Sequence, residues 1–435
     1  MRNKCKRYNI KIMDFRHDKL DLGGFVSTLL SFSPDIIGFS SLTSEFNLFK
    51  KLSILAKNNA PGSIIISGGP LATNYYIDIV KNKLTDFAVI GEGELTIDEL
   101  LDVIHNDGDY SSVKGIAYLK DDKVILTAPR EFIQDLDKVP FPAWDLIDLK
   151  SYSRLPNWNS ILARKYYAPI LTSRGCVYNC IFCHNLFGKK IRARTPQNVL
   201  SEIEFLYKEY DIREFHIIDD LFNFDLERVK NICNSIIEKK LKIKIAFPNG
   251  MRVDRIDKET LKLLKKAGTY KINFSIESAS PRLQKFMKKD LNFEKAKEVI
   301  EEASRLGILT FGYFMFGFPT ETAEEMKETL SFAVNSKLDA AKFFKATAFC
   351  NTELAKLTPD FIYGDDLDYP EDRVFYDKNI NYAAVPTAVL NSIILECHWK
   401  FYTKLSRIFR IFIKYRFFGA IKKLFDIYRY ILMQR

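Results

Sequence analysis

The sequence is short of cysteine and histidine, with seven cysteines and five histidines among 435 residues. Four cysteines, Cys5, Cys233, Cys350 and Cys397, are scattered, and an odd total argues against the disulfide framework of a secreted protein. The chain also lacks 18 uninterrupted apolar residues, which a membrane-spanning helix needs, and an apolar segment of the signal-peptide kind at its start. We therefore expect a folded protein in the cytoplasm, where thiols stay reduced.

The net positive charge is concentrated at the C-terminal end of the chain. Residues 400–435 contain ten Lys and Arg against one acid, Asp426, which gives this segment a net charge of +9. Because the whole chain carries +10, the first 399 residues carry only +1. Nucleic-acid binding by the main body of the chain is therefore not expected, since it requires a broad basic surface.

Short apolar runs alternate with helical segments between about residues 9 and 105. The runs NIKIMDF (9–15), DIIGFSS (35–41), SIIISGGP (63–70) and FAVIGEGE (87–94) each lead toward an amphipathic stretch. This alternation predicts parallel strands joined by crossover helices, and hence a doubly wound α/β domain over residues 1–110. The loops after the strands are either ordinary tight turns or the ligand-binding edge. Their residues are Ser40, Ser41, Thr43, Gly68, Gly69, Gly91, Glu92 and Gly93.

A linker and a second α/β region follow. A hairpin-like segment (115–130) and a proline-rich segment predict a linker over residues 111–160. The alternation then resumes with a longer period, which predicts a partial (β/α)6 barrel over residues 161–350 and an extension over 351–435. Strands are expected at 168–173, 214–219, 243–248, 271–277, 309–317 and 341–349, and helices near 196–210, 226–239, 258–267, 293–306 and 323–336. The loops after these strands should share one face, where a site is expected.

The remaining cysteines, Cys176, Cys180 and Cys183, lie within eight residues, just after the first strand of the predicted barrel. A disulfide is disfavoured by the odd number of cysteines and by the reducing compartment. A zinc site would need a fourth ligand, and the nearby His184 is adjacent to Cys183, which makes a joint tetrahedral chelate awkward. An iron–sulfur cluster with three protein thiolates fits better, and it leaves one iron open to a small molecule.

The stretch CVYNCIFC (176–183), with Phe182 before the last cysteine, resembles the motif of the radical S-adenosylmethionine (radical SAM) enzymes. The resemblance runs from about residue 168 to residue 350. It implies a 4Fe-4S cluster that cleaves S-adenosylmethionine to a 5′-deoxyadenosyl radical, which abstracts hydrogen from an unactivated carbon. It also implies an external electron donor such as flavodoxin or ferredoxin.

The resemblance assigns roles to residues in the loops of the barrel. Cys176, Cys180 and Cys183 would bind iron. The residues expected at S-adenosylmethionine are Asp219 and Asp220 (amine), Arg252 (carboxylate), Glu277 and Ser278 (ribose), and Gly317, Phe318 and Pro319 (adenine). Plainer roles compete with three of these: Asp220 could cap a helix, Arg252 could pair with Asp254, and Glu277 could satisfy a buried backbone donor.

The N-terminal region resembles the cobalamin-binding domain that precedes the barrel in a large subclass of this family. The matching stretches are PDIIGFSSLT (34–43), SGGPLAT (67–73) and DFAVIGEGELTIDELL (86–101). The sequence departs from the pattern in two ways. His17 does not match the Asp-x-His-x-x-Gly motif of a cobalt ligand, and the chain starts at what would be the second strand of that domain.

The resemblance implies methyl transfer to a poorly reactive carbon or phosphorus if cobalamin binds. A cobalamin-independent cyclase or coupling enzyme, acting on a small molecule or on a lipid or isoprenoid, is the alternative. A binding module without chemistry and a zinc-dependent scaffold or nucleic-acid-binding protein are remoter ones. The basic, aromatic segment 400–435 predicts a helix that packs over the barrel mouth, contacts an anionic membrane surface, or binds nucleic acid.

Overall fold

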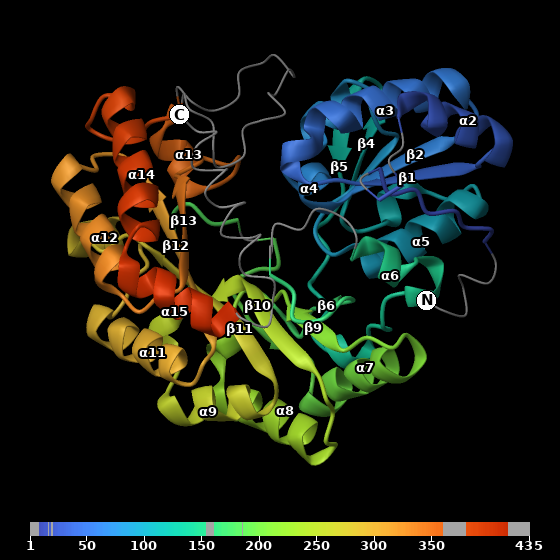
Figure 1. Ribbon diagram of the computed structural model, residues 1–435. Coiled ribbons are helices and arrows are strands. Elements are labelled where there is room, and N and C mark those ends of the chain that lie inside the picture. The colour runs from blue at the N-terminus through green and yellow to red at the C-terminus, as the bar shows by residue number, and fades with distance from the viewer. Residues whose placement is uncertain are drawn as a thin grey trace. The chain divides into compact units, whose positions relative to one another are not determined.

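The structure is a computed structural model that describes residues 8–15, 17–18, 21–153, 161–184, 186–359 and 380–415. These residues form two units (Figure 1). The first contains the chain up to Ile147 together with His184–Gly188, and the second contains Asp148–Cys183 and most of the chain from Lys189 onward. No helix in the described ranges combines the length and the apolar character that crossing a bilayer requires.

The first unit is built on a five-stranded sheet with the order β1-β2-β3-β4-β5. Strands β1, β2 and β3 run parallel, and β4 and β5 form the predicted hairpin, which extends this sheet in the antiparallel sense. The strands are β1 (Ile36–Ser40), β2 (Ile64–Gly68), β3 (Phe87–Val89), β4 (Ile116–Lys120) and β5 (Lys123–Leu126). The main helices are α2 (Leu22–Phe32), α3 (Phe46–Asn59), α4 (Gly69–Lys81) and α5 (Gly93–His105).

Helices cover both faces of this sheet, as the prediction of a doubly wound domain requires. Ile65 packs with Leu29 of α2 and Leu52 of α3, whereas its neighbour Ile66 packs with Leu100 of α5. Because successive side chains of a strand point to opposite faces, α2 and α3 lie on one face of the sheet and α5 lies on the other. The fold class predicted for this region is confirmed.

The strand predicted at residues 9–15 is wrong. No strand occurs in the described residues 8–15, and Ile10 and Ile12 are 44% and 48% exposed. An apolar run gives a segment the tendency to form a strand, but a strand also needs a neighbour that pairs with its N–H and C=O groups. The first strand of the described sheet is therefore β1, which pairs with β2.

The second unit is the predicted partial barrel. Its six-stranded sheet has the order β13-β12-β11-β10-β9-β6, and every pair is parallel. The strands are β6 (Ala168–Ile170), β9 (Glu214–Ile217), β10 (Lys244–Met251), β11 (Thr269–Glu277), β12 (Leu309–Phe316) and β13 (Ala340–Lys345). All six predicted strands are confirmed. A small antiparallel pair, β7 (Ser173–Arg174) with β8 (Arg192–Ala193), follows β6.

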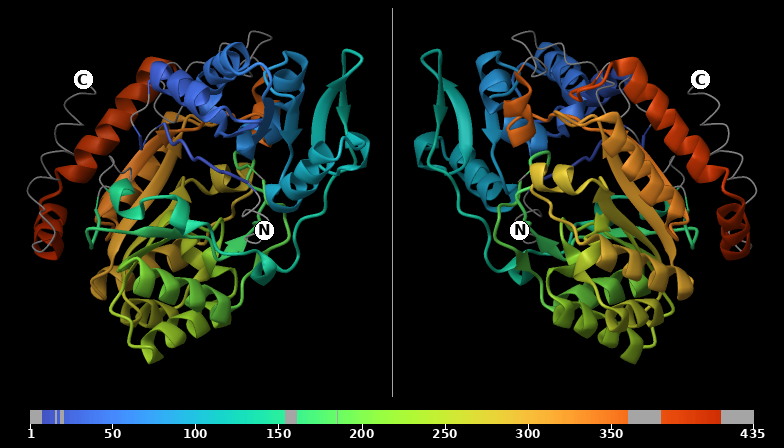
Figure 2. Two further views of the ribbon diagram at one scale, coloured as in Figure 1. Left: turned by 90° about the vertical axis from the view of Figure 1, so that its right-hand side faces the viewer. Right: turned by 90° about the vertical axis from the view of Figure 1, so that its left-hand side faces the viewer.

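The five predicted helices of the barrel are also confirmed, and they line the outer face of the curved sheet (Figures 1 and 2). They are α7 (Pro196–Glu209), α8 (Leu226–Glu238), α9 (Lys258–Lys266), α11 (Phe293–Arg305) and α12 (Ala323–Asn335). Each begins after a residue whose side chain accepts a backbone N–H of the first turn, which fixes the helix start. The short helices α6 (Leu149–Tyr152), α10 (Pro281–Phe286) and α13 (Glu353–Leu357) were not predicted.

Two helices of the C-terminal extension pack on the β13 side of the sheet. Helix α14 (Thr387–Tyr402) packs against α12 and β13, and α15 (Leu405–Tyr415) follows it. Ile411 of α15 packs against Leu309 of β12 and Ala340 of β13. Both contacts lie at the N-terminal ends of these strands, so α15 packs at the opposite end of the barrel from the predicted mouth. Residues 416–435 of the predicted tail helix lie outside the described residues.

Candidate cluster and cofactor sites

The loop that contains Cys176, Cys180 and Cys183, which we call the cysteine loop, leaves the sheet directly after β6 and β7. Gly175, with φ +94°, provides the backbone turn that leads into Cys176. The pairing of β7 with β8 ties the two ends of the loop together. Within the loop, the N–H of Cys183 donates to the carbonyl of Cys180 at 3.1 Å, so the last two cysteines share one turn. All three thiols are free.

Asp219 anchors the start of this loop to β9. Its side chain is 2% exposed, and Oδ1 accepts the N–H of Thr172 at 2.6 Å. Oδ2 accepts the hydroxyls of Thr172 and Ser173 at 2.5 and 2.6 Å. Asp220 lies beside it and accepts the N–H of Gly175 at 3.4 Å. Both acids therefore adjoin the cysteine loop, and their contact with a methionine amine stays a prediction.

A buried ion pair lies beside the cysteines. Lys289 Nζ donates to Glu277 Oε1 at 2.9 Å, and both side chains are less than 10% exposed. Burial raises the pKa of the Cys180 thiol, and the positive charges of Lys289 and Arg252 oppose that increase. The neighbouring Glu277 carboxylate raises the pKa of this thiol, so the two cations compensate only part of the effect of burial. The ribose contact predicted for Glu277 is not tested by this pairing.

Arg252 adopts the plainer of its two predicted arrangements. Its guanidinium donates to Asp254 at 2.9 and 3.3 Å and to the carbonyl of Asp290 at 3.0 Å. It also lies 3.9 Å from the ring centroid of Tyr178, which belongs to the cysteine loop. Arg252 therefore connects the end of β10 to the cysteine loop, while its predicted role at a carboxylate of S-adenosylmethionine stays a prediction.

A buried carboxyl group holds the loop after β12. Glu321 Oε2 accepts the N–H groups of Gly317 and Phe318 at 2.6 and 3.0 Å, and burial raises the pKa of Glu321 to about 8. The Phe318 ring lies 5.7 Å from that of Phe182 in the cysteine loop. The half-buried Pro319 follows. Ser278, after β11, shares a hydrogen bond of 3.2 Å with Thr329.

The parallel strands thus bring the predicted barrel residues to one edge, as expected from the strand order. Lys289 contributes there and was not predicted, because it acts through a contact that the fold creates. Tyr178 and Glu321 belong to stretches that were expected at this edge, CVYNCIFC (176–183) and GFPTET (317–322), but no role was predicted for either residue.

The predicted cobalamin-binding residues lie in the loops after β1, β2 and β3, at one edge of the sheet of the first unit. β1 ends at Ser40, β2 at Gly68 and β3 two residues before Gly91, so their loops adjoin because the strands are parallel. Gly69 has φ +79°, and a Cβ there would lie 3.1 Å from the carbonyl oxygen of Ser41. The Gly91 N–H donates to Thr73 at 3.1 Å. Glu92 accepts the N–H of Ile133 at 2.8 Å, and Gly93 begins α5.

Comparison with known proteins matches both units to families. Residues 170–333 match the radical SAM superfamily, and residues 4–101 match the B12 binding domain. An uncharacterized methyltransferase of Pyrococcus horikoshii is 30% identical over 354 residues, which cover 80% of this chain and 74% of the relative. The chain belongs to the radical SAM superfamily. Its N-terminal region is a B12-binding domain, so the resemblances found in the sequence are confirmed.

Other relatives differ in the reactions that their names describe. Cytidylyl-2-hydroxyethylphosphonate methyltransferase of Streptomyces wedmorensis is 30% identical over 76% of this chain and 68% of its own. Anaerobic magnesium-protoporphyrin IX monomethyl ester cyclase of Synechocystis is 28% identical over 72% of this chain and 62% of its own. The fold is similar to that of TsrM, a radical SAM methyltransferase of Kitasatospora setae whose structure was solved with cobalamin and a [4Fe-4S] cluster bound. The TM-score is 0.67, and the sequences are 16% identical over 81% of this chain and 69% of TsrM.

The cysteine loop fits the cluster of a radical SAM domain. It offers three free thiols in a loop whose two ends are tied together by the pairing of β7 with β8. In the described part of the chain, no three His, Cys, Asp or Glu side chains converge on a single metal ion. A cubane does not require such convergence, because each thiolate binds a different iron.

The edge of the B12-binding domain fits a large polar cofactor. Within the described ranges, the Thr43 and Ser67 hydroxyls are buried without a hydrogen-bond partner. Both belong to the strand ends or loops of this edge, and buried hydroxyls normally have a partner. The close approach of Gly69 to Ser41 also requires glycine at this position. Cobalamin amide or phosphate groups would supply partners for the two hydroxyls.

Proposed function

We propose that the protein is a cobalamin-dependent radical SAM methyltransferase that modifies a carbon or phosphorus atom of low reactivity. The observation that carries this proposal is the presence of both matched domains in one chain, together with two methyltransferases among the relatives at 30% identity. When bound, the cluster and S-adenosylmethionine supply a 5′-deoxyadenosyl radical, and cobalamin supplies a methyl carrier.

The residues of the chain bind and orient these groups. Cys176, Cys180 and Cys183 would hold the cluster and leave one iron for S-adenosylmethionine. The contact between Phe182 and Phe318 supports a fixed position of the cysteine loop relative to the loop after β12, where the adenine is expected. The fixed loop geometry provided by Glu321 would limit the motion of the bound nucleoside.

We further infer a cytoplasmic enzyme that receives electrons from an external donor such as flavodoxin or ferredoxin. The scattered cysteines agree with a reducing compartment. A small molecule or a lipid is the proposed substrate class, and nucleic acid is not, because the first 399 residues carry a net charge of only +1.

Ring closure is the second candidate, favoured by the similarity to the magnesium-protoporphyrin cyclase. The products of S-adenosylmethionine distinguish the two reactions. A methyltransferase that uses one S-adenosylmethionine as methyl donor and another as radical source yields S-adenosylhomocysteine as well as 5′-deoxyadenosine. A cyclase yields 5′-deoxyadenosine alone.

The experiment is to incubate the reconstituted, cobalamin-loaded protein with S-adenosylmethionine and a reductant, without oxygen, and to quantify both nucleosides by liquid chromatography. A Cys176→Ala variant gives the background. Formation of S-adenosylhomocysteine above that background supports methyl transfer. Its absence, with 5′-deoxyadenosine still formed, would reject methyl transfer in favour of ring closure.

A further inference from the structure

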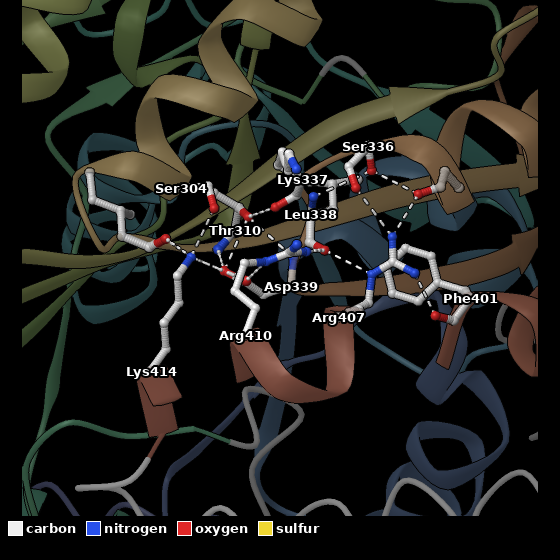
Figure 3. A network of polar contacts seen from close by, with 12 residues as sticks. Ser304, Thr310, Ser336, Lys337, Leu338, Asp339, Phe401, Arg407, Arg410 and Lys414 are labelled. Atoms are coloured by element: carbon white, nitrogen blue, oxygen red, sulfur yellow. Dashed lines mark hydrogen bonds and ion pairs between the residues drawn. The ribbon is translucent and has the colours of Figure 1, made fainter. Parts of the chain in front are cut away.

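Helix α15 turns its cationic side chains toward the protein (Figure 3). Arg407 is 1% exposed, and its Nη2 donates to three carbonyls at and beyond the C-terminal end of α12, at 3.0 to 3.3 Å. Arg410 Nε and Lys414 Nζ pair with the buried carboxylate of Asp339 at 2.9 and 2.8 Å. Carbonyl groups at a helix C-terminus and a buried carboxylate are strong acceptors for these cations.

The same helix turns large apolar side chains toward the solvent. Leu405, Phe409 and Ile413 are 80%, 68% and 57% exposed. They are spaced four residues apart, so they form one row along the helix, which we call the α15 apolar stripe. A surface helix of a globular protein usually has its apolar side chains inward and its charges outward. In α15 this arrangement is reversed.

The inward contacts fix the rotation of α15 about its axis. A turn by one residue, about 100°, would withdraw Arg407, Arg410 and Lys414 from their acceptors together. Ile411, on the inward side, would also leave its contacts with Leu309 and Ala340. The outward direction of the α15 apolar stripe is therefore specified by the most strongly bonded side chains of the helix.

The chain after α15 combines the same kinds of residue. Residues 416–435 contain five Lys and Arg against one Asp, and five aromatic residues. Aromatic side chains and basic residues in one segment suit the interface of an anionic membrane, where rings lie at headgroup depth and cations meet lipid phosphates. Five basic residues against one acid give this segment a net charge of +4. An anionic lipid surface attracts such a segment, whereas a second copy of the chain would bring like charges together, so the charge favours lipid over a second copy.

We propose that the α15 apolar stripe holds the protein at the surface of an anionic membrane. The contact is peripheral: the stripe enters the boundary between headgroups and acyl chains, and the basic residues add electrostatic attraction. This proposal does not depend on the reaction assigned above, because it rests on α15 and on the composition of the C-terminal segment alone.

The test is flotation of the full chain with vesicles of phosphatidylcholine alone and of phosphatidylcholine mixed with phosphatidylglycerol. A combined variant, Leu405→Ser with Phe409→Ser and Ile413→Ser, removes the stripe and leaves the inward cations in place. The matched control, Leu30→Ser with Ile77→Ser and Leu95→Ser, removes three apolar side chains that are 64%, 52% and 49% exposed on α2, α4 and α5.

We expect the full chain and the control to float with the anionic vesicles, more weakly at high salt, and the stripe variant to bind at least about tenfold less. Equal flotation of the stripe variant and the unmodified chain would overturn the proposal. So would failure of the unmodified chain to float. A dimer in sedimentation velocity that the stripe variant alone dissolves, without vesicle binding, would assign the stripe to a second copy instead.

Discussion

Replacing Asp339 with Asn tests how α15 is held against the barrel. The Asp339 carboxylate is fully buried at the N-terminal end of β13 and accepts the N–H of Thr310 at 3.0 Å, besides its ion pairs with Arg410 and Lys414 (Figure 3). The Asn side chain keeps the shape of Asp and one acceptor oxygen. It removes the negative charge that neutralises two largely buried cations.

The cost follows from the contacts that remain. Removing one partner of a buried ion pair costs about 3–5 kcal/mol. We take the lower end, because Arg410 keeps its hydrogen bond to the Leu338 carbonyl at 2.6 Å and Lys414 keeps the Ile308 carbonyl at 3.3 Å. A loss of about 3 kcal/mol corresponds to a roughly 150-fold change in an equilibrium constant. Local opening of α15 should therefore become roughly 150-fold more favourable.

Native-state hydrogen exchange, read by mass spectrometry on peptides from 405–415, measures this opening. Glu294→Gln is the control, because that carboxylate is 85% exposed and pairs with a surface lysine, so a change below about 0.5 kcal/mol is expected. Protection of α15 that stays within a factor of about three of the unmodified protein would show that Asp339 does not hold the helix, and that apolar contacts such as those of Ile411 hold it instead.

Three further predictions concern the sites. Cys176→Ala, Cys180→Ala and Cys183→Ala should each lower the iron content of the reconstituted protein and abolish 5′-deoxyadenosine formation; full iron loading in any of them would remove that cysteine from the ligand set. Gly69→Ala should cost about 1–2 kcal/mol, because φ there is +79°, and should lower the cobalt retained after gel filtration without changing the iron content. The pKa of Glu321 is raised from 4.5 to about 8. Between these two pH values the folded state holds a proton that the unfolded chain has released. The free energy of unfolding should therefore fall as pH rises from about 5 to 8. Glu321→Gln should flatten this dependence in urea titrations at several pH values; an unchanged slope would contradict the assignment.

Local features of the sequence predicted the barrel well. Each of its long strands carries a run of apolar residues, and each outer helix starts at a capping residue such as Thr195 or Thr322. The cysteine motif could also be predicted, because its three expected ligands are close together in the sequence. Features of this kind depend on residues that are close together in the sequence, so they can be recognised before the fold is known.

The contacts that were missed join residues far apart in the sequence. Asp219 accepts hydrogen bonds from Thr172 and Ser173, about 47 residues earlier, and nothing local indicates that partnership. The run at 9–15 has the composition of a strand, but its composition does not supply a pairing neighbour.

The direction of α15 was hidden for a related reason. The spacing of its apolar and basic residues reveals two faces, but it does not reveal which face packs inward. That choice depends on Asp339 and on the carbonyl groups at the end of α12, which only the fold brings to the helix.

Radical chemistry in this chain is tested by the EPR spectrum of the protein after anaerobic reconstitution with iron and sulfide and reduction with dithionite. The spectrum is recorded with and without S-adenosylmethionine. We expect the signal of a reduced 4Fe-4S cluster that S-adenosylmethionine alters, because one iron is open to it. The same samples should release 5′-deoxyadenosine. A spectrum that S-adenosylmethionine leaves unchanged, with no nucleoside formed, would contradict the assignment of radical chemistry to this chain.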